Sequence, residues 1–298
     1  MSETNELKTV AEWVENIVKL LGENANGPIL METAMSAARV DVMDVLVAHG
    51  LNIHEKNANG ETYLHFAAAS GLVEAMKWLL DNGVDVNAQC NDGFTPIHRA
   101  AMSGSVCAIE YLKERGADIN AIDNAGCSPM VSAVVCNRTG SIKCLEKLGV
   151  DVNAKDDKGR TPMFRAALGD GESSKIASMI CLAKLGADVN ARDNDGTTPI
   201  FWTLQSGHGD IESIKSLKEL GADINTRDND GITPIIAAAF MCPIECLNCL
   251  VELGADVAAK AENGMTAADA AEKAGRSEEA EWLRIQEEIS VNNKARRL

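Results

Sequence analysis

Short apolar segments alternate along the chain with polar turns that are rich in Asp, Asn and Gly. The stretch at 187–200, ADVNARDNDGTTPI, returns almost unchanged at 222–235 as ADINTRDNDGITPI. An Ala-rich segment such as Ile97–Gly104 follows each Thr-Pro pair, and a second apolar segment such as Val73–Gly83 ends at a glycine. A hydroxyl N-cap followed by proline starts a helix, and glycine suits the left-handed conformation that ends one. The pattern therefore predicts a repeat of helix, loop, helix and projecting turn.

The repeat has a period close to 33 residues. The glycine of the polar turn recurs at intervals of 33, 33, 33, 33, 37, 35 and 33 residues, at Gly27, Gly60, Gly93, Gly126, Gly159, Gly196, Gly231 and Gly264. A second series shows the same irregular intervals, at Gly50, Gly83, Gly116, Gly149, Gly186, Gly221 and Gly254. Two series with one shared period indicate a repeat array.

The repeat resembles that of the ankyrin family. The stretch 59–91, NGETYLHFAAASGLVEAMKWLLDNGVDVNAQCN, follows the family pattern nearly throughout, and the resemblance extends over 26–289. It implies an all-α solenoid of stacked helix-loop-helix units with projecting β-turns. It also implies that a histidine at the seventh position bonds between loops. Only His65 and His98 supply it here, and the equivalent places elsewhere hold Val131, Phe164, Phe201 and Ile236.

The two ends differ from the central repeats. We expect an N-terminal capping helix at 1–25, a degenerate first ankyrin repeat at 26–58, six ankyrin repeats at 59–262, a C-terminal capping repeat at 263–289 and a frayed basic tail at 290–298. One face of the first segment is apolar, with Val10, Trp13, Val14, Ile17, Val18 and Leu21. Polar outer repeats keep a solenoid soluble, so the charged end of the last repeat fits a cap.

Composition narrows the class of protein. The net charge of −16 disfavours a nucleic-acid partner, because neutralising phosphates requires an excess of Lys and Arg. The longest apolar stretch, PIIAAAFMCPI, is too short to span a membrane, and the N-terminus is polar. Nine cysteines without paired spacing suit a reducing cytosol. We expect a cytoplasmic monomer without cofactor, nucleic-acid or membrane partner.

Two repeats are longer than the others, and the surplus falls in the loops 168–175 and 206–212. Insertions in repeat proteins often carry function, although harmless variation is common because surface loops tolerate insertion. His208 with Asp210 could form an acid–base pair, and Asp170 with Glu172 could bind a cation. Neither set comes with a nucleophile or a complete calcium-loop spacing, so we predict no catalytic residue and no metal site.

The cysteines allow two interpretations. Cys242, Cys246 and Cys249 lie close enough in sequence for a metal site. However, Cys144, Cys181 and Cys249 occupy the same place in their second helices, where earlier repeats have Trp78 and Tyr111, which indicates an interior packing position. Helices about 8–10 Å apart would hold such cysteines beyond the disulfide reach of about 7 Å. We therefore predict buried thiols.

The family resemblance implies that first helices and turns line a concave face. The variable positions on this face collect aromatic, Met and Arg side chains, which are enriched in the cores of interfaces. The predicted partner-binding residues are Phe66, Phe94, Arg99, Met102, Arg160, Arg165, Trp202 and Phe240. The alternative is that several of them are partly buried between neighbouring first helices, since Phe and Met are usually core residues.

The sequence therefore predicts a non-catalytic scaffold that binds a protein or peptide in a concave groove, with an acidic segment as one candidate partner. Trp202 is the expected anchor, flanked by Arg160, Arg165 and Phe240, and should contribute little to packing. Alternatives are a regulatory subunit or effector that controls a bound enzyme, a small site on the inserted loops, and nucleic-acid binding through the arginines. We also expect 125–229 to open first, because the longer repeats and a shortened second helix after 136–141 interrupt it.

Overall fold

Helices and turns, without a strand, make up the part of the chain that the computed structural model describes, which is residues 27–168, 176–205 and 209–295. The expected capping helix at 1–25 lies outside these residues. The chain divides into an N-terminal unit, Met1–Val150, and a C-terminal unit, Asp151–Leu298. No helix in the described ranges is long and apolar enough to cross a membrane.

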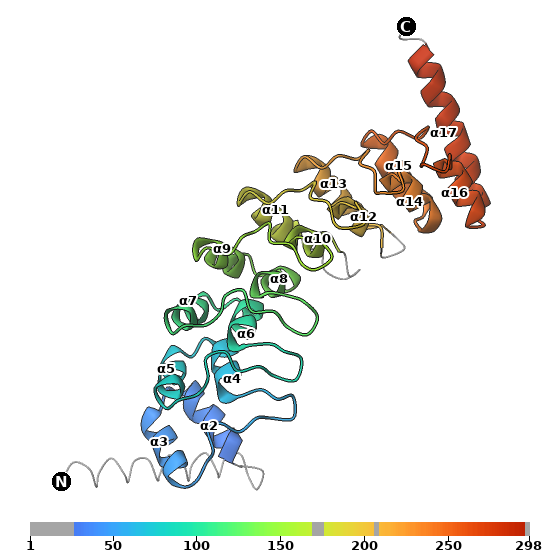
Figure 1. Cartoon of the computed structure of the whole chain (residues 1–298). Helices are drawn as coiled ribbons and strands as arrows, with labels where there is room; N and C mark the ends of the chain where they lie inside the picture. Colours follow the sequence, from blue (N-terminus) through green and yellow to red (C-terminus); the bar gives the residue numbers. More distant parts are fainter. Residues whose placement is uncertain (1–26, 169–175, 206–208, 296–298) are drawn as a thin grey trace, which may run out of the picture. The chain divides into compact units, whose positions relative to one another are not determined.

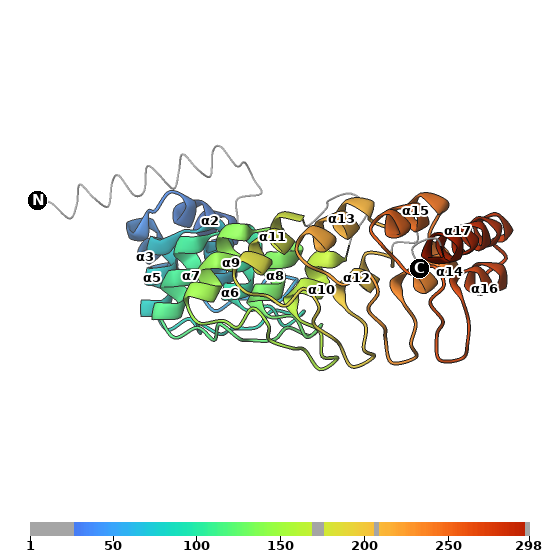
Figure 2. The ribbon, with the colours of Figure 1, turned by 90° about the horizontal axis from the view of Figure 1, so that it is seen from above.

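The N-terminal unit is a stack of helix pairs (Figure 1). Its helices are α2 (Gly27–Ser36), α3 (Val40–Ala48), α4 (Tyr63–Ser70), α5 (Val73–Asp81), α6 (Pro96–Ser103), α7 (Val106–Glu114), α8 (Pro129–Val135) and α9 (Thr139–Lys147). The first helices α2, α4, α6 and α8 pack in one row, and the second helices α3, α5, α7 and α9 pack in another. The turns between successive pairs project to one side of the helices (Figure 2).

Local sequence explains where the first helices begin and end. In α6, Thr95 is an extended N-cap, Pro96 occupies the first turn, and Gly104 ends the helix with a φ of 91°. Ile97, Ala100 and Ala101 are fully buried. Small alanines allow the neighbouring first helices to approach closely, so the core is thin and built mainly from Ala, Leu, Ile and Met.

The C-terminal unit contains a second stack. Its helices are α10 (Pro162–Ala167), α11 (Ile176–Lys184), α12 (Pro199–Trp202), α13 (Ile211–Glu219), α14 (Pro234–Met241), α15 (Ile244–Glu252), α16 (Ala267–Lys273) and α17 (Ser277–Ala295). The rows α10, α12, α14, α16 and α11, α13, α15 repeat the two layers of the other unit, and α17 packs on α16. This arrangement confirms the predicted all-α solenoid of stacked helix pairs.

In the two longer repeats the first helix is short, whereas the second helix keeps its usual length. Helix α10 has 6 residues and α12 has 4, whereas α4, α6 and α14 have 8 each. The expectation of a shortened second helix after 136–141 is wrong, because α9 has 9 residues, as do α5 and α7. Asn137 adopts a φ of 54° and so takes the left-handed role that Gly104 has one repeat earlier. Helix α9 therefore starts without loss of length.

Adjacent turns are bonded to each other at two levels. The Asn124 backbone N–H donates to the carbonyl of Asp92 at 3.0 Å, and the Asn124 side-chain amide donates to the carbonyl of Asn91 at 2.9 Å. Gly93 lies beneath this contact with a φ of 81°, and a Cβ there would be 2.8 Å from the Asn124 nitrogen. Glycine is therefore required by both conformation and space.

The asparagine of the Asp-Val/Ile-Asn sequence joins several of the repeats to the next one. Asn190 Oδ1 accepts from the Asp223 backbone N–H at 2.8 Å, and Asn190 Nδ2 donates to the Gly221 carbonyl at 3.1 Å. Asn153 and Asn225 make the same two bonds to the Asp and Gly that follow them. The polar turn recurs so faithfully because these copies satisfy backbone groups of their neighbours.

The C-terminal helix is longer than the sequence suggested. Helix α17 runs for 19 residues to Ala295, so it continues through most of the segment expected to be a frayed tail. No Gly or Pro interrupts the sequence of this helix, and the helix can therefore continue beyond its contacts with α16. Its buried side chains include Ala280 and Leu283.

Candidate partner-binding surfaces

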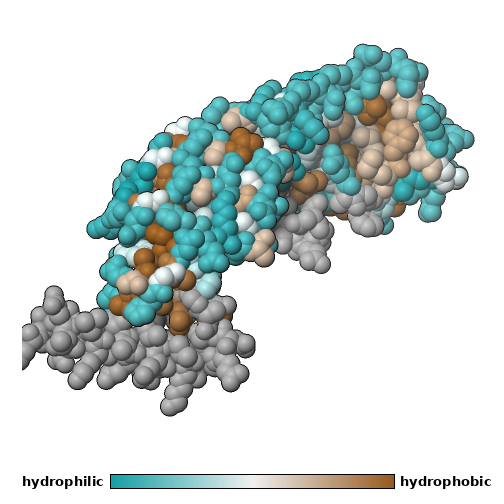
Figure 3. Space-filling view, turned by 60° about the horizontal axis from the view of Figure 1, so that its bottom comes forward, coloured by the Kyte–Doolittle hydropathy of each residue, from teal (hydrophilic) through white to brown (hydrophobic). Residues whose placement is uncertain are grey.

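All eight predicted binding residues lie in the described part of the chain. Seven of them are partly exposed, whereas Trp202 is buried. One group is in the N-terminal unit and contains Phe94, Arg99 and Met102; another is in the C-terminal unit and contains Arg160, Arg165 and Trp202. On the face shown in Figure 3, hydrophobic residues of the N-terminal unit form small separate patches among hydrophilic ones.

In the N-terminal unit, Arg99 of α6 connects two adjacent turns. Its Nε lies 2.7 Å from Glu61 Oε1, and its guanidinium carbon lies 4.8 Å from the centre of the Phe94 ring. The Phe94 ring in turn meets His98 edge to face, with 5.7 Å between centroids. The charge of Arg99 is therefore compensated within the chain, and its side chain is held in one orientation.

In the C-terminal unit, Trp202 is surrounded by an aromatic ring and two arginines. Phe164 of α10 meets the indole edge to face at 5.6 Å between centroids. The guanidinium carbons of Arg160 and Arg165 lie 5.3 Å and 5.7 Å from the indole centre. These distances are within the range of cation–π attraction, so the two arginines and the indole stabilise one another.

The burial of Trp202 overturns one expectation from the sequence. Its side chain is 9% exposed, whereas a residue that projects into a groove and adds little to packing would be largely accessible. The reason is the size of its neighbour, because Phe164 stands where the regular repeats have a histidine and packs against the indole. Phe240, expected beside Trp202, makes no ring contact with it within the described ranges.

The three arginines differ in how their charges are balanced. Arg160 Nε donates to Asp156 Oδ2 at 2.7 Å, and the pKa of that carboxyl is lowered by this bond despite the opposing effect of burial. Arg99 is paired with Glu61. Arg165 contacts the indole but has no carboxylate partner among the residues that the structure describes. A carboxylate from another molecule can therefore bind Arg165 without displacing one that belongs to the described part of the chain.

The two histidines expected to bond between loops do so. Thr95 and His98 form a capping pair, and His98 Nε2 lies 3.1 Å from the carbonyl of Cys127 in the next turn. His65 makes the equivalent contact with the Phe94 carbonyl at 2.9 Å. Burial lowers the pKa of both imidazoles, which favours their neutral forms.

Three of the repeats without the histidine leave a buried hydroxyl unsatisfied. Thr161, Thr198 and Thr233 occupy the same N-cap position as Thr95, but their hydroxyls have no hydrogen-bond partner in the described part of the chain. An unpaired buried hydroxyl costs free energy that the paired ones do not. Helices α10, α12 and α14 are therefore less firmly held at their N-termini than α6, whereas α16 has a complete capping box of Thr266 and Asp269.

The inserted loops contribute one residue whose role is now visible. His208, Asp170 and Glu172 lie outside the described residues. Asp210 caps α13, since its carboxylate accepts from the Ser213 backbone N–H at 3.1 Å and from the Ser213 hydroxyl at 2.6 Å. This role explains the carboxylate without acid–base chemistry.

The three cysteines that were predicted to lie in the interior are packing residues. Cys144, Cys181 and Cys249 are 5–6% exposed, which confirms the predicted burial. Cys242 and Cys246 are also buried and share a hydrogen bond. No three His, Cys, Asp or Glu side chains of residues 27–168, 176–205 and 209–295 are grouped so as to hold a metal ion.

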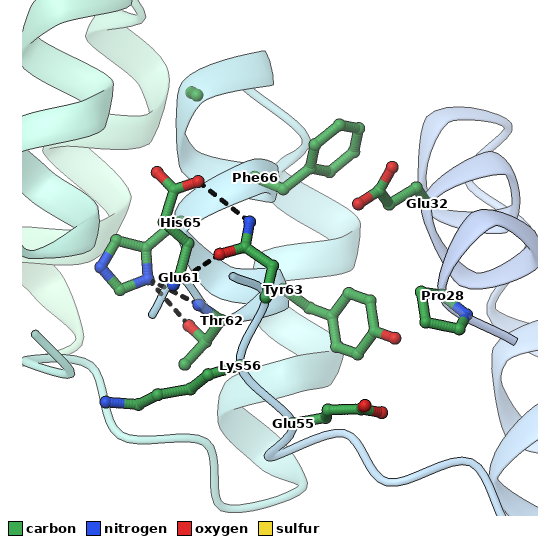
Figure 4. A pocket seen from close by; sticks show the side chains of 11 residues that line it. Pro28, Glu32, Glu55, Lys56, Glu61, Thr62, Tyr63, His65 and Phe66 are labelled. Atoms are coloured by element: carbon green, nitrogen blue, oxygen red, sulfur yellow. Dashed lines mark hydrogen bonds between the residues drawn. The ribbon is translucent and has the colours of Figure 1, made fainter. Parts of the chain in front are cut away.

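Sequence reasoning missed a cavity beside α2 and α4. It has a volume of about 220 Å³, and its walls include Pro28, Glu32, Glu55, Tyr63 and Phe66 (Figure 4). The available signal was Thr62-Tyr63, which stands where the following repeats have Thr-Pro or Ser-Pro. Tyrosine in place of proline brings a buried phenol to the cavity between the first two described repeats.

Stacked helix pairs joined by bonded turns define the chain as a helical repeat protein. The family model for ankyrin repeats (3 copies) matches overlapping segments at 10–90, 30–123, 64–156, 132–228, 165–261 and 208–295. The chain belongs to the ankyrin-repeat family.

Among solved structures, the human ASB11 ankyrin repeat domain is similar, with 26% sequence identity and a TM-score of 0.59. The match covers 75% of this chain and 96% of that one. No curated protein matches the chain. Ankyrin repeats are in general modules for protein–protein interaction and are typically non-catalytic.

Proposed function

We propose that this chain is a non-catalytic scaffold that binds a protein or peptide partner through the concave groove of its ankyrin repeats. Within the C-terminal unit, an acidic segment of the partner binds beside Arg165. The observation that carries this proposal is the difference among the arginines. Arg99 and Arg160 are paired with Glu61 and Asp156, whereas Arg165 has no carboxylate partner within the described ranges.

An acidic segment suits this position for both geometric and electrostatic reasons. The guanidinium of Arg165 lies 5.7 Å from the indole centre of Trp202, which limits the orientations it adopts. A guanidinium held in this way binds a carboxylate through two parallel hydrogen bonds and loses little conformational entropy. On a chain of net charge −16, a cation of this kind also distinguishes the site from the rest of the surface.

We infer that the protein acts as a monomer in the cytoplasm. Its nine cysteines are free thiols. Free thiols persist in a reducing compartment, whereas an oxidising one favours disulfides.

The test is a quantitative affinity capture with matched variants. The wild-type chain, Arg165→Gln and Lys218→Gln are immobilised, and the proteins that each retains from a cell lysate are compared by mass spectrometry. Both substitutions remove one positive charge, but Lys218 is an exposed residue of the second helix α13. The amount of the principal partner that Arg165→Gln retains should be at least about tenfold lower than for the wild type, as expected for the loss of a charged contact of about 1.5–3 kcal/mol.

Two further measurements make the result decisive. A thermal melt of Arg165→Gln must match that of the wild type, because the substitution should affect binding and not folding. Arg165→Lys should recover only part of the binding, since an ammonium cannot form the two parallel bonds. Equal capture by Arg165→Gln and the wild type would show that the partner uses a different surface.

A further inference from the structure

The cavity beside α2 and α4 contains a buried hydroxyl that the chain leaves unpaired. Tyr63 is 7% exposed, and its hydroxyl has no hydrogen-bond partner among the residues that the structure describes. In Figure 4 this hydroxyl points into the space between Pro28, Glu32 and Glu55. Buried polar groups are almost always bonded, so an unpaired one that faces a cavity indicates a missing ligand atom.

The carboxylates around this hydroxyl are also unpaired. Glu32 of α2 is partly exposed and Glu55 is exposed, and neither carboxylate forms an ion pair or hydrogen bond in the described part of the chain. Burial raises the pKa of Tyr63 to about 12, and the charges of Glu55 and Glu32 contribute to the rise. Two negative charges therefore stand close to a phenol that remains protonated at neutral pH.

The other charged residues of the wall are already engaged. Glu61 pairs with Arg99 at 2.7 Å and accepts from Asn57 Nδ2 at 3.1 Å. Lys56 extends to the opposite side in Figure 4, where its Nζ donates to the carbonyl of Gln89 at 2.9 Å. The two unpaired carboxylates are thus not neutralised by this lysine. Among the described residues that line it, the cavity has an excess of negative charge.

The shape of the cavity determines what kind of cation fits. The rings of Tyr63 and Phe66 line it together with Pro28 and Ala69, and so do the carboxylates of Glu32, which is partly exposed, and Glu55, which is exposed. The volume of about 220 Å³ is smaller than a pocket for a drug-sized ligand. An alkyl stem that ends in a positive group matches this lining and this volume, because the stem can pack on the rings and the positive group can bind the carboxylates. A bare metal ion does not, because no three potential ligand side chains are grouped within the described ranges.

We propose that this cavity binds the side chain of a lysine or arginine residue from a peptide. The stem lies against Tyr63 and Phe66, and the ammonium or guanidinium group donates hydrogen bonds to Glu32, Glu55 and the Tyr63 oxygen. The site is in the N-terminal unit and does not involve Arg165. This site would prefer a basic residue, whereas the segment proposed to bind at Arg165 is acidic. The two proposals are therefore tested independently.

The two tyrosines of the chain allow a direct test. The full-length protein is prepared with 3-fluorotyrosine, and its fluorine NMR spectrum is recorded; Tyr63→Phe assigns the resonance of Tyr63. The probes are three capped tripeptides in which glycines flank a central arginine, lysine or glutamine. Arginine and lysine peptides should produce a saturable shift at Tyr63, and the glutamine peptide should not. Tyr111, on α7, serves as an internal reference and should not shift.

Charge variants then identify the ligand contacts. Glu32→Gln and Glu55→Gln should each raise the Kd of the arginine peptide by about fivefold, as expected for a partly exposed ion pair. The control Glu110→Gln removes an exposed carboxylate of α7 outside the cavity and should leave the Kd unchanged. Added salt should weaken binding.

Three results would overturn the proposal. The Tyr63 resonance could remain unmoved by the basic peptides, move equally with the glutamine peptide, or shift together with that of Tyr111. Equal affinity in Glu32→Gln, Glu55→Gln and the wild type would also exclude the carboxylates as ligands.

Discussion

Replacement of the buried indole at Trp202 by alanine should destabilise the C-terminal unit strongly. The side chain is 9% exposed and ends the short helix α12, where it packs against Phe164 of α10. Its removal deletes the ring contact between two first helices that are already shorter than those of the regular repeats. A cavity would remain, because helices tied by bonded turns cannot collapse fully into it.

The expected cost is about 3–5 kcal/mol, the range observed when a buried Phe or Trp is replaced by Ala. Part of this sum is the edge-to-face pair with Phe164, about 0.5–1.5 kcal/mol. The contacts with Arg160 and Arg165 add about 0.5–1 kcal/mol each. Trp202→Phe should cost less, since it retains a ring against Phe164.

The assay combines urea unfolding with hydrogen exchange read by mass spectrometry. Stability in a repeat array is a sum of local and nearest-neighbour terms, so the loss should be concentrated near α10, α12 and α14. Trp282→Ala, which truncates a partly exposed tryptophan of α17, is the control for removing an indole as such. Peptides from α4 and α6 provide the internal reference for exchange.

A loss below about 1 kcal/mol, with unchanged exchange in α10 and α12, would refute this reasoning. It would mean that the indole is not a packing residue, and that Trp202 projects toward a partner as the sequence first suggested. The same variant is unsuitable as a test of binding, because lost structure would lower affinity by itself.

Three other predictions concern stability. Thr95→Val should cost about 1 kcal/mol in urea unfolding because it breaks a capping pair, whereas Thr233→Val should be neutral or stabilising because its hydroxyl is unpaired; equal costs would contradict this. Burial lowers the pKa of His98, so the folded state binds the proton less well than the unfolded chain, and stability should be complete above about pH 6.5 and fall below it. A smaller pH slope in His98→Gln would support this origin, and an unchanged slope would exclude it. Finally, hydrogen exchange should be faster at 125–229 than at 59–124, and uniform protection would contradict that expectation.

Features set by a few adjacent residues could be predicted from the sequence. The Thr95-Pro96 start and Gly104 end of α6 follow from local chemistry that acts within one helix. The burial of Cys249 could also be predicted, because its place in the period is shared by other interior residues. In both cases the position within the repeat predicts the surroundings of the residue, so the prediction does not depend on contacts between distant parts of the chain.

Features that depend on unlike neighbours could not be predicted. The burial of Trp202 depends on the large ring of Phe164, at a position where the family usually has histidine. The pairing of Arg99 with Glu61 crosses from one repeat to the preceding turn, and a period gives no rule for residues that vary. The cavity at Tyr63 requires a degenerate repeat on one side and a substituted proline on the other. Such sites arise where the repeats differ, which is also where recognition is expected.

The asparagines that join the repeats have a consequence for how such a chain lengthens. Asn190 completes the bonding of Asp223 and Gly221 in the next repeat, and Asn225 does the same for the repeat after that. A repeat that recombination duplicates in register would therefore carry its own asparagine, which can bond to the Asp and Gly of the repeat after it. It would also carry the Asp and Gly that bond to the asparagine of the repeat before it. The joints would be complete at the moment of duplication, while the first-helix positions of the two copies would be free to diverge. Lengthening by whole repeats thus requires no new hydrogen bonds between repeats. An insertion of any other length changes the helices of the repeat instead, as the shortened α10 and α12 show.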